Sequence, residues 1–254
     1  MANRSILITG CSSGIGLAVA RGLRERHWRV FASARKAEDV ERLRQEGFES
    51  LRLDVTDPAS VEAAVAEVLT RTGGGLDALF SNAGYGQVGA VEDLTRAALR
   101  EQFDTNLFGA VELANRIIPV MRRQGHGRVV FNSSVLGYAA FPYRGAYTAS
   151  KFAMEGLCDT LRQELAPANI QVCLVEPGPI VSRFRENCLP AFERHIDWRH
   201  SAHRAQYEPQ LARLNKPGPA APFTLPAEAV LDKVIHALEA KRPRPRYPVT
   251  VPAV

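Results

Sequence analysis

Short apolar runs alternate along this chain with longer segments in which apolar residues recur every three or four positions. The runs predict buried strands over 4–9, 28–33, 49–53, 76–80, 128–131 and 170–175, and an edge strand with prolines over 247–251. The periodic segments predict helices that begin after Gly16 and that cover 38–46, 58–69, 95–122, 147–166 and 226–240. This alternation is typical of an α/β fold in which helices flank a doubly wound parallel sheet.

Residues 183–224 depart from the alternation. They combine amphipathic helical patches with a stretch rich in Pro, Gly and Ala over 217–222. Connections on a rigid scaffold frequently carry binding and catalytic groups. We therefore expect one catalytic domain over residues 1–254, with 183–224 inserted as a mobile lid over the substrate.

A glycine-rich turn follows the first strand directly, and a helix pattern opens after it. Glycines let the backbone turn tightly and approach a pyrophosphate, and the helix N-terminus offers free N–H groups to the phosphates. A glycine turn without a ligand is the alternative. We expect the turn to bind a dinucleotide through Gly10, Ser12, Ser13, Gly14, Ile15 and Gly16.

The second strand runs into Ala34 and Arg35. In dinucleotide-binding folds, an acidic residue about 20 positions after the turn binds the ribose 2′-hydroxyl, whereas an arginine nearby accommodates a 2′-phosphate. Ala34 lies 20 residues after Gly14, so no carboxylate at this place would repel a phosphate. The pattern favours NADP(H) over NAD(H), and the alternative is an arginine on a surface turn.

Tyr147 and Lys151 lie four residues apart at the start of a predicted helix, on one face and with Cβ atoms about 5–6 Å apart. An ammonium group beside a phenol favours the phenolate, which would lower the tyrosine pKa from about 10 and suit proton transfer. Ser134 follows the strand over 128–131, at the sheet edge where α/β folds bind ligands. Alone, the pair is a weak signal, because a surface tyrosine packed against a lysine stem has the same spacing.

The composition is ordinary for a globular protein, with 254 residues of which 46% are hydrophobic and 23% charged. The formal net charge of +5 is scattered apart from a basic run over 241–246, for which we expect a solvated loop and no nucleic-acid partner. No apolar run approaches the roughly 20 residues that cross a bilayer, and nothing resembles a signal peptide. We expect a cytoplasmic protein without a transmembrane segment.

The four cysteines show neither disulfide nor metal spacing, as in proteins of a reducing compartment. His195, His200 and His203 lie close in the sequence, but no cysteine or carboxylate cluster with zinc spacing accompanies them. We therefore expect these histidines to be solvated and the protein to bind no metal.

Taken together, the motifs resemble the short-chain dehydrogenase/reductase family over nearly the whole chain. Each motif is weak alone, but their order and spacing are specific. They are Thr9-Gly10-x-x-x-Gly14-Ile15-Gly16, Asp54, Asn82-Ala83-Gly84, Asn106, Ser134, Tyr147-x-x-x-Lys151 and Pro177-Gly178. The chain is most similar to bacterial NADP-dependent aldehyde reductases, with hydroxysteroid dehydrogenase-like members nearby. The resemblance implies a single-domain Rossmann-like sheet with strand order 3-2-1-4-5-6-7.

The resemblance also implies a catalytic tetrad. Tyr147 would protonate the substrate oxygen, Lys151 would bind the nicotinamide ribose and lower the Tyr147 pKa, Ser134 would hydrogen-bond the substrate oxygen, and Asn106 would hold a water. Further cofactor contacts are implied for Asp54, Val55, Asn82, Ala83, Gly84, Tyr147, Lys151, Pro177, Gly178, Ile180 and Ser182. The helices around 97–122 and 147–166 would form the interface of a homodimer or homotetramer.

This chain departs from the family pattern at two positions. Ser13 stands where some NADP-binding members carry a basic residue, so Arg35 carries most of the cofactor prediction. Ser182 stands where threonine is common and keeps the hydroxyl.

We expect an NADPH-dependent reductase of aldehyde or ketone carbonyls. The alternatives are an alcohol, hydroxysteroid or retinol dehydrogenase that runs in the oxidative direction, and, less favoured, a non-catalytic dinucleotide sensor. The same tetrad would serve either enzyme, so the sequence does not separate the two.

Overall fold

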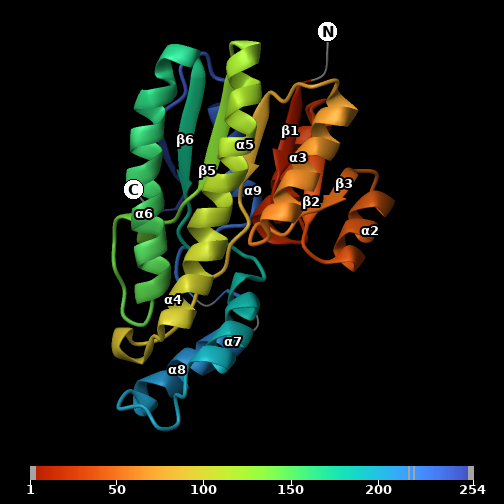
Figure 1. Cartoon of the computed structure of the whole chain (residues 1–254). Coiled ribbons are helices and arrows are strands. Elements are labelled where there is room, and N and C mark those ends of the chain that lie inside the picture. Colours follow the sequence, from red (N-terminus) through yellow and green to blue (C-terminus); the bar gives the residue numbers. More distant parts are fainter. Residues whose placement is uncertain (1–3, 217, 220, 251–254) are drawn as a thin grey trace.

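Seven parallel strands form one sheet in the computed structural model, which describes residues 4–216, 218–219 and 221–250 (Figure 1). The strands are β1 (Ser5–Ile8), β2 (Arg29–Ala34), β3 (Glu49–Arg52), β4 (Ala78–Ser81), β5 (Gly127–Asn132), β6 (Ile170–Glu176) and β7 (Arg246–Pro248). Their order is β3-β2-β1-β4-β5-β6-β7, which confirms the expected topology. The edge strand β7 pairs with β6, and Val251, the predicted end of this strand, lies outside the described residues.

Helices cover both faces of the sheet (Figure 1). One face packs against α1 (Gly14–Glu25), α2 (Ala37–Gln45) and α9 (Glu228–Glu239), and the other against α3 (Pro58–Thr72), α5 (Gly109–Gln124) and α6 (Gly145–Leu165). Side chains alternate between these two cores along each strand, as the pleat requires. Leu7 packs in the core of α3 and α5, whereas its neighbours Ile6 and Ile8 pack in the core of α1 and α9.

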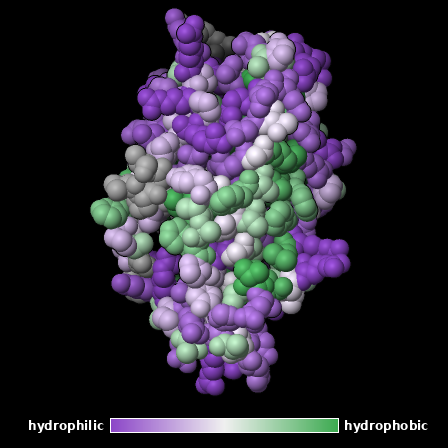
Figure 2. All heavy atoms as spheres, turned by 90° about the vertical axis from the view of Figure 1, so that its left-hand side faces the viewer, coloured by the Kyte–Doolittle hydropathy of each residue, from purple (hydrophilic) through white to green (hydrophobic). Residues whose placement is uncertain are grey.

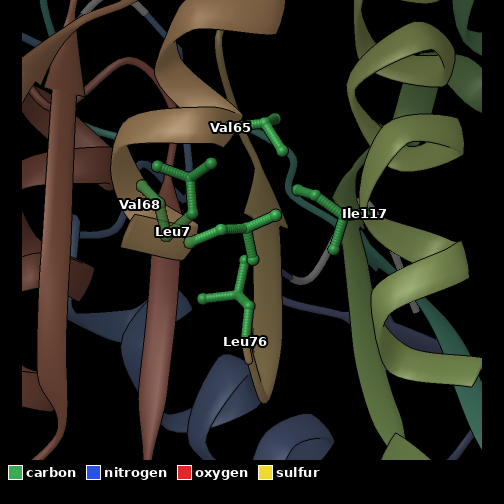
Figure 3. A pocket seen from close by; sticks show the side chains of 6 residues that line it. Leu7, Val65, Val68, Leu76 and Ile117 are labelled. Atoms are coloured by element: carbon green, nitrogen blue, oxygen red, sulfur yellow. The ribbon is translucent and has the colours of Figure 1, made fainter. Parts of the chain in front are cut away.

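A small void lies between α3, α5 and the sheet (Figure 3). Its lining is wholly aliphatic and consists of Leu7, Val65, Val68, Leu69, Leu76 and Ile117. It has no room for a water molecule and presents no polar group. It is therefore a packing defect of the core and not a binding site.

The helix predicted over 95–122 is interrupted. It divides into α4 (Arg96–Phe103), a π turn over Asp104–Phe108, and α5. The extra residue of a π turn is accommodated where a side chain stabilises it, and Asn106 bonds the backbone of a neighbouring segment at this point. Gly109 follows, and a Cβ there would lie 2.1 Å from the carbonyl oxygen of Val55. The helix predicted over 95–122 is therefore present, but it contains a π turn whose place depends on contacts with remote segments.

Two helices occupy most of the segment 183–224, and they pack on each other beyond the carboxyl ends of the strands, at the bottom of Figure 1. They are α7 (Phe184–His195) and α8 (Arg204–Asn215). Cys188, Phe192, Tyr207 and Leu214 form a satellite core with Val88. Positions 217 and 220 lie outside the described residues, and closure of this segment over a substrate remains a prediction.

The expectation of solvated histidines was right only for His200, whose side chain is 84% exposed. The side chain of His195 is 13% exposed and bonds Glu101, and that of His203 is 30% exposed and pairs with Glu92. These carboxylates belong to a segment about 100 residues away in the sequence, so local sequence patterns could not predict the two contacts. Within the described ranges, no three potential ligands gather around a metal position. No described helix is both long enough and apolar enough to cross a membrane.

Candidate active site

The glycine-rich turn between β1 and α1 has the backbone that its sequence predicts. Gly10 and Gly14 have φ of 71° and 57°, in the left-handed region that favours glycine. A Cβ on Gly16 would lie 2.3 Å from the carbonyl oxygen of Gly10, so the turn closes tightly. Ser13 makes no side-chain cap on α1, and no acidic residue lies in the first helical turn. The free N–H groups at this helix end fit an anionic pyrophosphate.

Thr9 and Asn82 tie the glycine-rich turn to the ends of β4 and β5. The Thr9 hydroxyl accepts from the backbone N–H groups of Asn82 at 2.8 Å and Ala83 at 2.9 Å. The Asn82 amide donates to the Thr9 carbonyl at 2.9 Å, and its oxygen accepts from Asn132 Nδ2 at 2.9 Å. The predicted contact residues Asn82 and Ala83 therefore fix the glycine-rich turn to the neighbouring strand ends.

Two arginines follow β2: Arg35 comes directly after the strand, and Arg42 lies in the next helix. Arg35 is exposed, and its side chain makes no hydrogen bond or ion pair within the described part of the chain. Arg42, on α2, donates to the carbonyl oxygen of Ser12 at 2.7 Å and also pairs with Asp39. Sequence reasoning missed Arg42, because only the packing of α2 against the turn brings it there.

Asp54 and Val55 lie in the turn that follows β3. The Asp54 carboxylate accepts from the Thr56 backbone N–H at 3.0 Å and from its hydroxyl at 2.8 Å. Val55 is buried against Gly109. Asp54 thus stabilises a local turn, while one carboxylate oxygen stays uncommitted.

Ser134 joins the ends of β5 and β6. It is 6% exposed, and its hydroxyl accepts from the Leu136 N–H at 3.1 Å and donates to the Pro177 carbonyl at 3.3 Å. Gly178 leaves room for Thr250, which follows β7, since a Cβ on Gly178 would lie 2.0 Å from the Thr250 hydroxyl oxygen.

Ile180 and Ser182 continue this connection toward the glycine-rich turn. Ile180 forms a parallel β-bridge with Leu225, so the residues just before and just after the 183–224 segment pair with each other. A Cβ on Gly14 would lie 2.9 Å from the Ser182 Cβ, so Ser182 borders the turn. The connection after β6 therefore lies against the glycine-rich turn after β1.

Tyr147 lies in the first turn of α6 and is 9% exposed. Burial raises the pKa of its hydroxyl, and a hydrogen bond with Ser134 acts in the opposite direction. Its ring packs against Phe184 of α7 at a centroid distance of 5.5 Å. The phenol is therefore protonated at neutral pH and shielded from bulk water.

Lys151 follows one turn later and is 5% exposed. Its Nζ donates to the Asn132 carbonyl oxygen at 2.6 Å and lies 5.7 Å from the Tyr147 ring centroid. Burial lowers the pKa of Lys151 to about 8, against an opposing effect of Glu155. The net effect on the Tyr147 pKa in this structure is a rise, because desolvation of the phenol is the largest cause. A lowering of that pKa by Lys151 stays a prediction.

Asn106 lies fully buried in the π turn. Its oxygen accepts from the Tyr85 N–H at 3.1 Å, and its amide donates to the Tyr85 carbonyl at 2.9 Å and to the Ser150 hydroxyl at 3.3 Å. Gly84 lies beside it, since a Cβ there would be 3.0 Å from the Asn106 oxygen. Asn106 thus connects the segment after β4 to the helix that carries Lys151.

Asn132 was not predicted as a site residue, although it connects two of them. It contacts Lys151 through its carbonyl and Asn82 through its amide. Its place directly before Ser133 and Ser134, at the end of a buried strand, is the signal that could have found it.

The chain is similar to known proteins. A family model described as short chain dehydrogenase matches residues 4–191. The uncharacterized oxidoreductase YbbO of Escherichia coli K12 is 43% identical over 248 residues, which cover 98% of this chain and 86% of that protein. Human 17-beta-hydroxysteroid dehydrogenase type 1 is 36% identical over 262 residues, covering 97% and 77%.

A solved structure agrees with these sequence matches. A short-chain dehydrogenase from Streptomyces avermitilis superposes with a TM-score of 0.79 at 30% identity, covering 98% of this chain and 88% of that one. The family model, the two relatives and the strand order all lead to one conclusion. The chain belongs to the short-chain dehydrogenase/reductase family and is an oxidoreductase of that family.

Proposed function

We propose that this protein is an NADPH-dependent reductase of aldehyde or ketone carbonyls. One observation carries the proposal: the buried Tyr147 side chain lies beside Ser134, with Lys151 one helical turn away, at the sheet edge that also holds the glycine-rich turn. A phenol in this state is poised to donate a proton, which is the role a reductase requires.

In the proposed reaction, a bound reduced nicotinamide would supply a hydride to the carbonyl carbon. Ser134 would donate a hydrogen bond to the carbonyl oxygen, whose negative charge grows as the bond to carbon is reduced. Tyr147 would transfer its proton to that oxygen. Lys151, with a pKa of about 8, would stabilise the resulting phenolate by its charge, and Asn106 would hold a water that returns a proton.

The cofactor proposal rests on charge and shape at three places. The α1 N-terminus and the glycines around Gly14 would bind the pyrophosphate. Arg35, exposed and unpaired within the described residues, would bind the 2′-phosphate of NADP(H). Asp54, Asn82 and the connection after β6 would line the remainder of the cleft.

Oxidation of a hydroxysteroid or another alcohol is the second candidate. The 36% identity to human 17-beta-hydroxysteroid dehydrogenase type 1 favours it. Comparing initial rates for NADPH with aldehydes against NADP⁺ with a hydroxysteroid separates the two. A non-catalytic sensor is disfavoured because Ser134, Tyr147 and Lys151 are all retained.

The proposal extends to assembly and location. We propose a homodimer or homotetramer that forms through α5 and α6, and a lid formed by 183–224 that closes when substrate binds. We also propose a cytoplasmic location, because all four cysteines are free thiols, as in reducing compartments.

The substitution Tyr147→Phe tests the reaction. Removing the hydroxyl should lower kcat by a factor on the order of 10² to 10⁴ while the NADPH dissociation constant, measured by nucleotide fluorescence, stays near the wild-type value. Tyr138→Phe, on an exposed tyrosine, is the control and should retain activity. Wild-type turnover by Tyr147→Phe would contradict the proposed proton donor.

A further inference from the structure

Three half-buried arginines gather where α6, α7 and α8 meet. They are Arg144, at the start of α6, Arg185 of α7 and Arg213 of α8. None of the three has an ion pair with a carboxylate within the described residues. Buried charges are normally paired, so this cluster is a departure from ordinary packing.

The contacts of Arg144 place it against one face of α8. Its Nη2 donates to the Gln210 side-chain oxygen at 3.1 Å, and its Nη1 donates to the Tyr143 carbonyl at 3.0 Å. Gln210 and Arg213 are three residues apart on α8 and therefore share a face. Arg144 and Arg213 thus approach the same surface of that helix.

The other two arginines differ in what they bind. Arg185 donates to the carbonyl oxygens of Arg213 at 2.9 Å and Lys216 at 2.8 Å, so it caps the end of α8. The Arg213 guanidinium has no hydrogen-bond or ion-pair partner in the described part of the chain. Arg213 is therefore a free donor, while Arg185 is already engaged.

The pKa values of Arg144 and Arg213 reflect burial without a neighbouring carboxylate charge among the described residues. Burial lowers the pKa of Arg144 to about 10, and the positive charge of Arg213 acts in the same direction. Burial also lowers the pKa of Arg213, and here the charge of Arg185 adds to the effect. An anion placed between Arg144 and Arg213 would offset both the desolvation and the repulsion.

The arginines lie near the proposed proton donor. Arg144 precedes Tyr147 by three residues, about one helical turn. The Cys188 thiol is close enough to influence the pKa of Arg144, Arg213 and Tyr147 alike. Phe184, one turn before Cys188, packs directly on the Tyr147 ring. A molecule with its carbonyl at Tyr147 would therefore extend toward these guanidinium groups.

We propose that Arg144 and Arg213 bind an anionic group of the substrate, so that the natural substrate is an aldehyde or ketone that also carries a carboxylate, phosphate or sulfonate. Guanidinium groups bind such anions through paired N–H donors, which gives both affinity and orientation. The inference rests on the proposed reductase function and narrows its substrate class.

A matched pair of aldehydes tests the site. The wild-type enzyme with NADPH should reduce 4-carboxybenzaldehyde with a kcat/KM on the order of 10 to 100 times that for its methyl ester, as expected for a charged hydrogen bond. The aldehydes 4-formylphenyl phosphate and 4-formylbenzenesulfonate then show which anion is preferred. Arg144→Met and Arg213→Met should bring the acid-to-ester ratio close to one, and Arg213→Lys should keep part of it.

Arg204→Met is the matched control, because Arg204 is exposed on the same helix α8 and should leave the ratio unchanged. A binding measurement on the wild type is independent of the folding of any variant: benzoate should inhibit reduction of the ester at least about 10-fold more strongly than benzamide. Equal kcat/KM for acid and ester, or a ratio that survives in both methionine variants, would overturn the anion site. Failure of NADPH to reduce any member of the panel would instead contradict the proposed function itself.

Discussion

Burial acts in opposite directions on the two ionisable groups of the proposed site. Desolvation favours neutral forms, so it raises the pKa of Tyr147 and lowers that of Lys151 to about 8. A neutral phenol is a proton donor, and a lysine that titrates near 8 exchanges protons readily in the physiological range. The raised pKa keeps the phenol neutral but also makes it a weaker acid, so the proposed proton transfer needs the charge of Lys151 to stabilise the phenolate that it leaves.

Cofactor choice is also a property of single residues. Ala34→Asp combined with Arg35→Ala places a carboxylate at the ribose and removes the guanidinium, so we expect the ratio of kcat/KM for NADPH to that for NADH to fall about 100-fold or more. Steady-state rates with NADPH and with NADH give this ratio for the wild type and the double variant. Lys36→Ala is the control, since Lys36 is exposed and pairs with Glu38. An unchanged ratio in the double variant would remove Arg35 as the determinant.

At the level of elements, charge helps to hold the edge strand β7. Arg246 of β7 contacts Glu155 of α6 at 3.0 Å, Glu176 of β6 at 3.3 Å and Asp159 of α6 at 2.6 Å. Glu176 is 3% exposed, and burial together with the nearby Glu155 charge raises its pKa to about 7. Two buried carboxylates thus share one guanidinium nitrogen.

This arrangement predicts a pH-dependent stability. Between the ordinary glutamate pKa of 4.5 and about 7, the folded state binds more protons at Glu176 than the unfolded state does. The free energy of unfolding therefore falls as the pH rises through this window. The Glu176→Gln side chain does not titrate, so its free energy of unfolding should not include this loss. Between pH 5 and pH 7.5 we expect the free energy of unfolding to fall less for Glu176→Gln than for the wild type, by on the order of 1–3 kcal/mol.

Denaturant unfolding of both proteins at the two pH values checks this prediction. Glu186→Gln is the control, because Glu186 is exposed and pairs locally with Arg183. Parallel pH profiles for wild type and Glu176→Gln would show that Glu176 is not protonated in the folded protein near neutrality.

Helices and strands were predictable where the local pattern of apolar and polar residues is sufficient to specify them. All seven strands and the helices of the two layers were expected near their observed places. Their ends were less certain: α3 continues to Thr72, and Gly73, with φ of 72°, ends it. The π turn at Asn106 was not predicted, and the helical patches expected in 183–224 were given no bounds, because remote contacts with Tyr85 and Val88 stabilise these elements.

On the scale of the whole molecule, one apolar surface stands out. Figure 2 shows an apolar patch on the side of the molecule where α6 lies. A groove of about 410 Å³ runs between α5 and α6, lined by Leu107, Phe108, Val111, Glu112, Asn115, Arg116 and Leu157. Phe108 and Phe152 are 54% and 47% exposed. Large exposed apolar patches mark interaction surfaces, which supports the proposed homo-oligomer.

A charge in this patch should prevent assembly. We expect Phe108→Asp and Phe152→Asp to yield monomers, because each places a carboxylate in a desolvated interface. Light scattering coupled to size-exclusion chromatography measures the mass in solution. Phe223→Asp is the control: Phe223 is 62% exposed in the segment after α8, and its φ of 56° suits aspartate. A monomeric wild type, or oligomers of unchanged size in both variants, would refute an interface at α5 and α6.

The sequence by itself determined the sheet, the family and the positions of the glycine-rich turn, Ser134, Tyr147 and Lys151. These follow from spacing within one element or at one strand end, and local chain geometry is encoded by local residues. Only the tertiary structure decided the direction of the Tyr147 pKa, the engagement of Lys151 by Asn132, and the convergence of Arg144 with Arg213. Desolvation and charge contacts depend on segments that are far apart in the chain, so no spacing rule contains them.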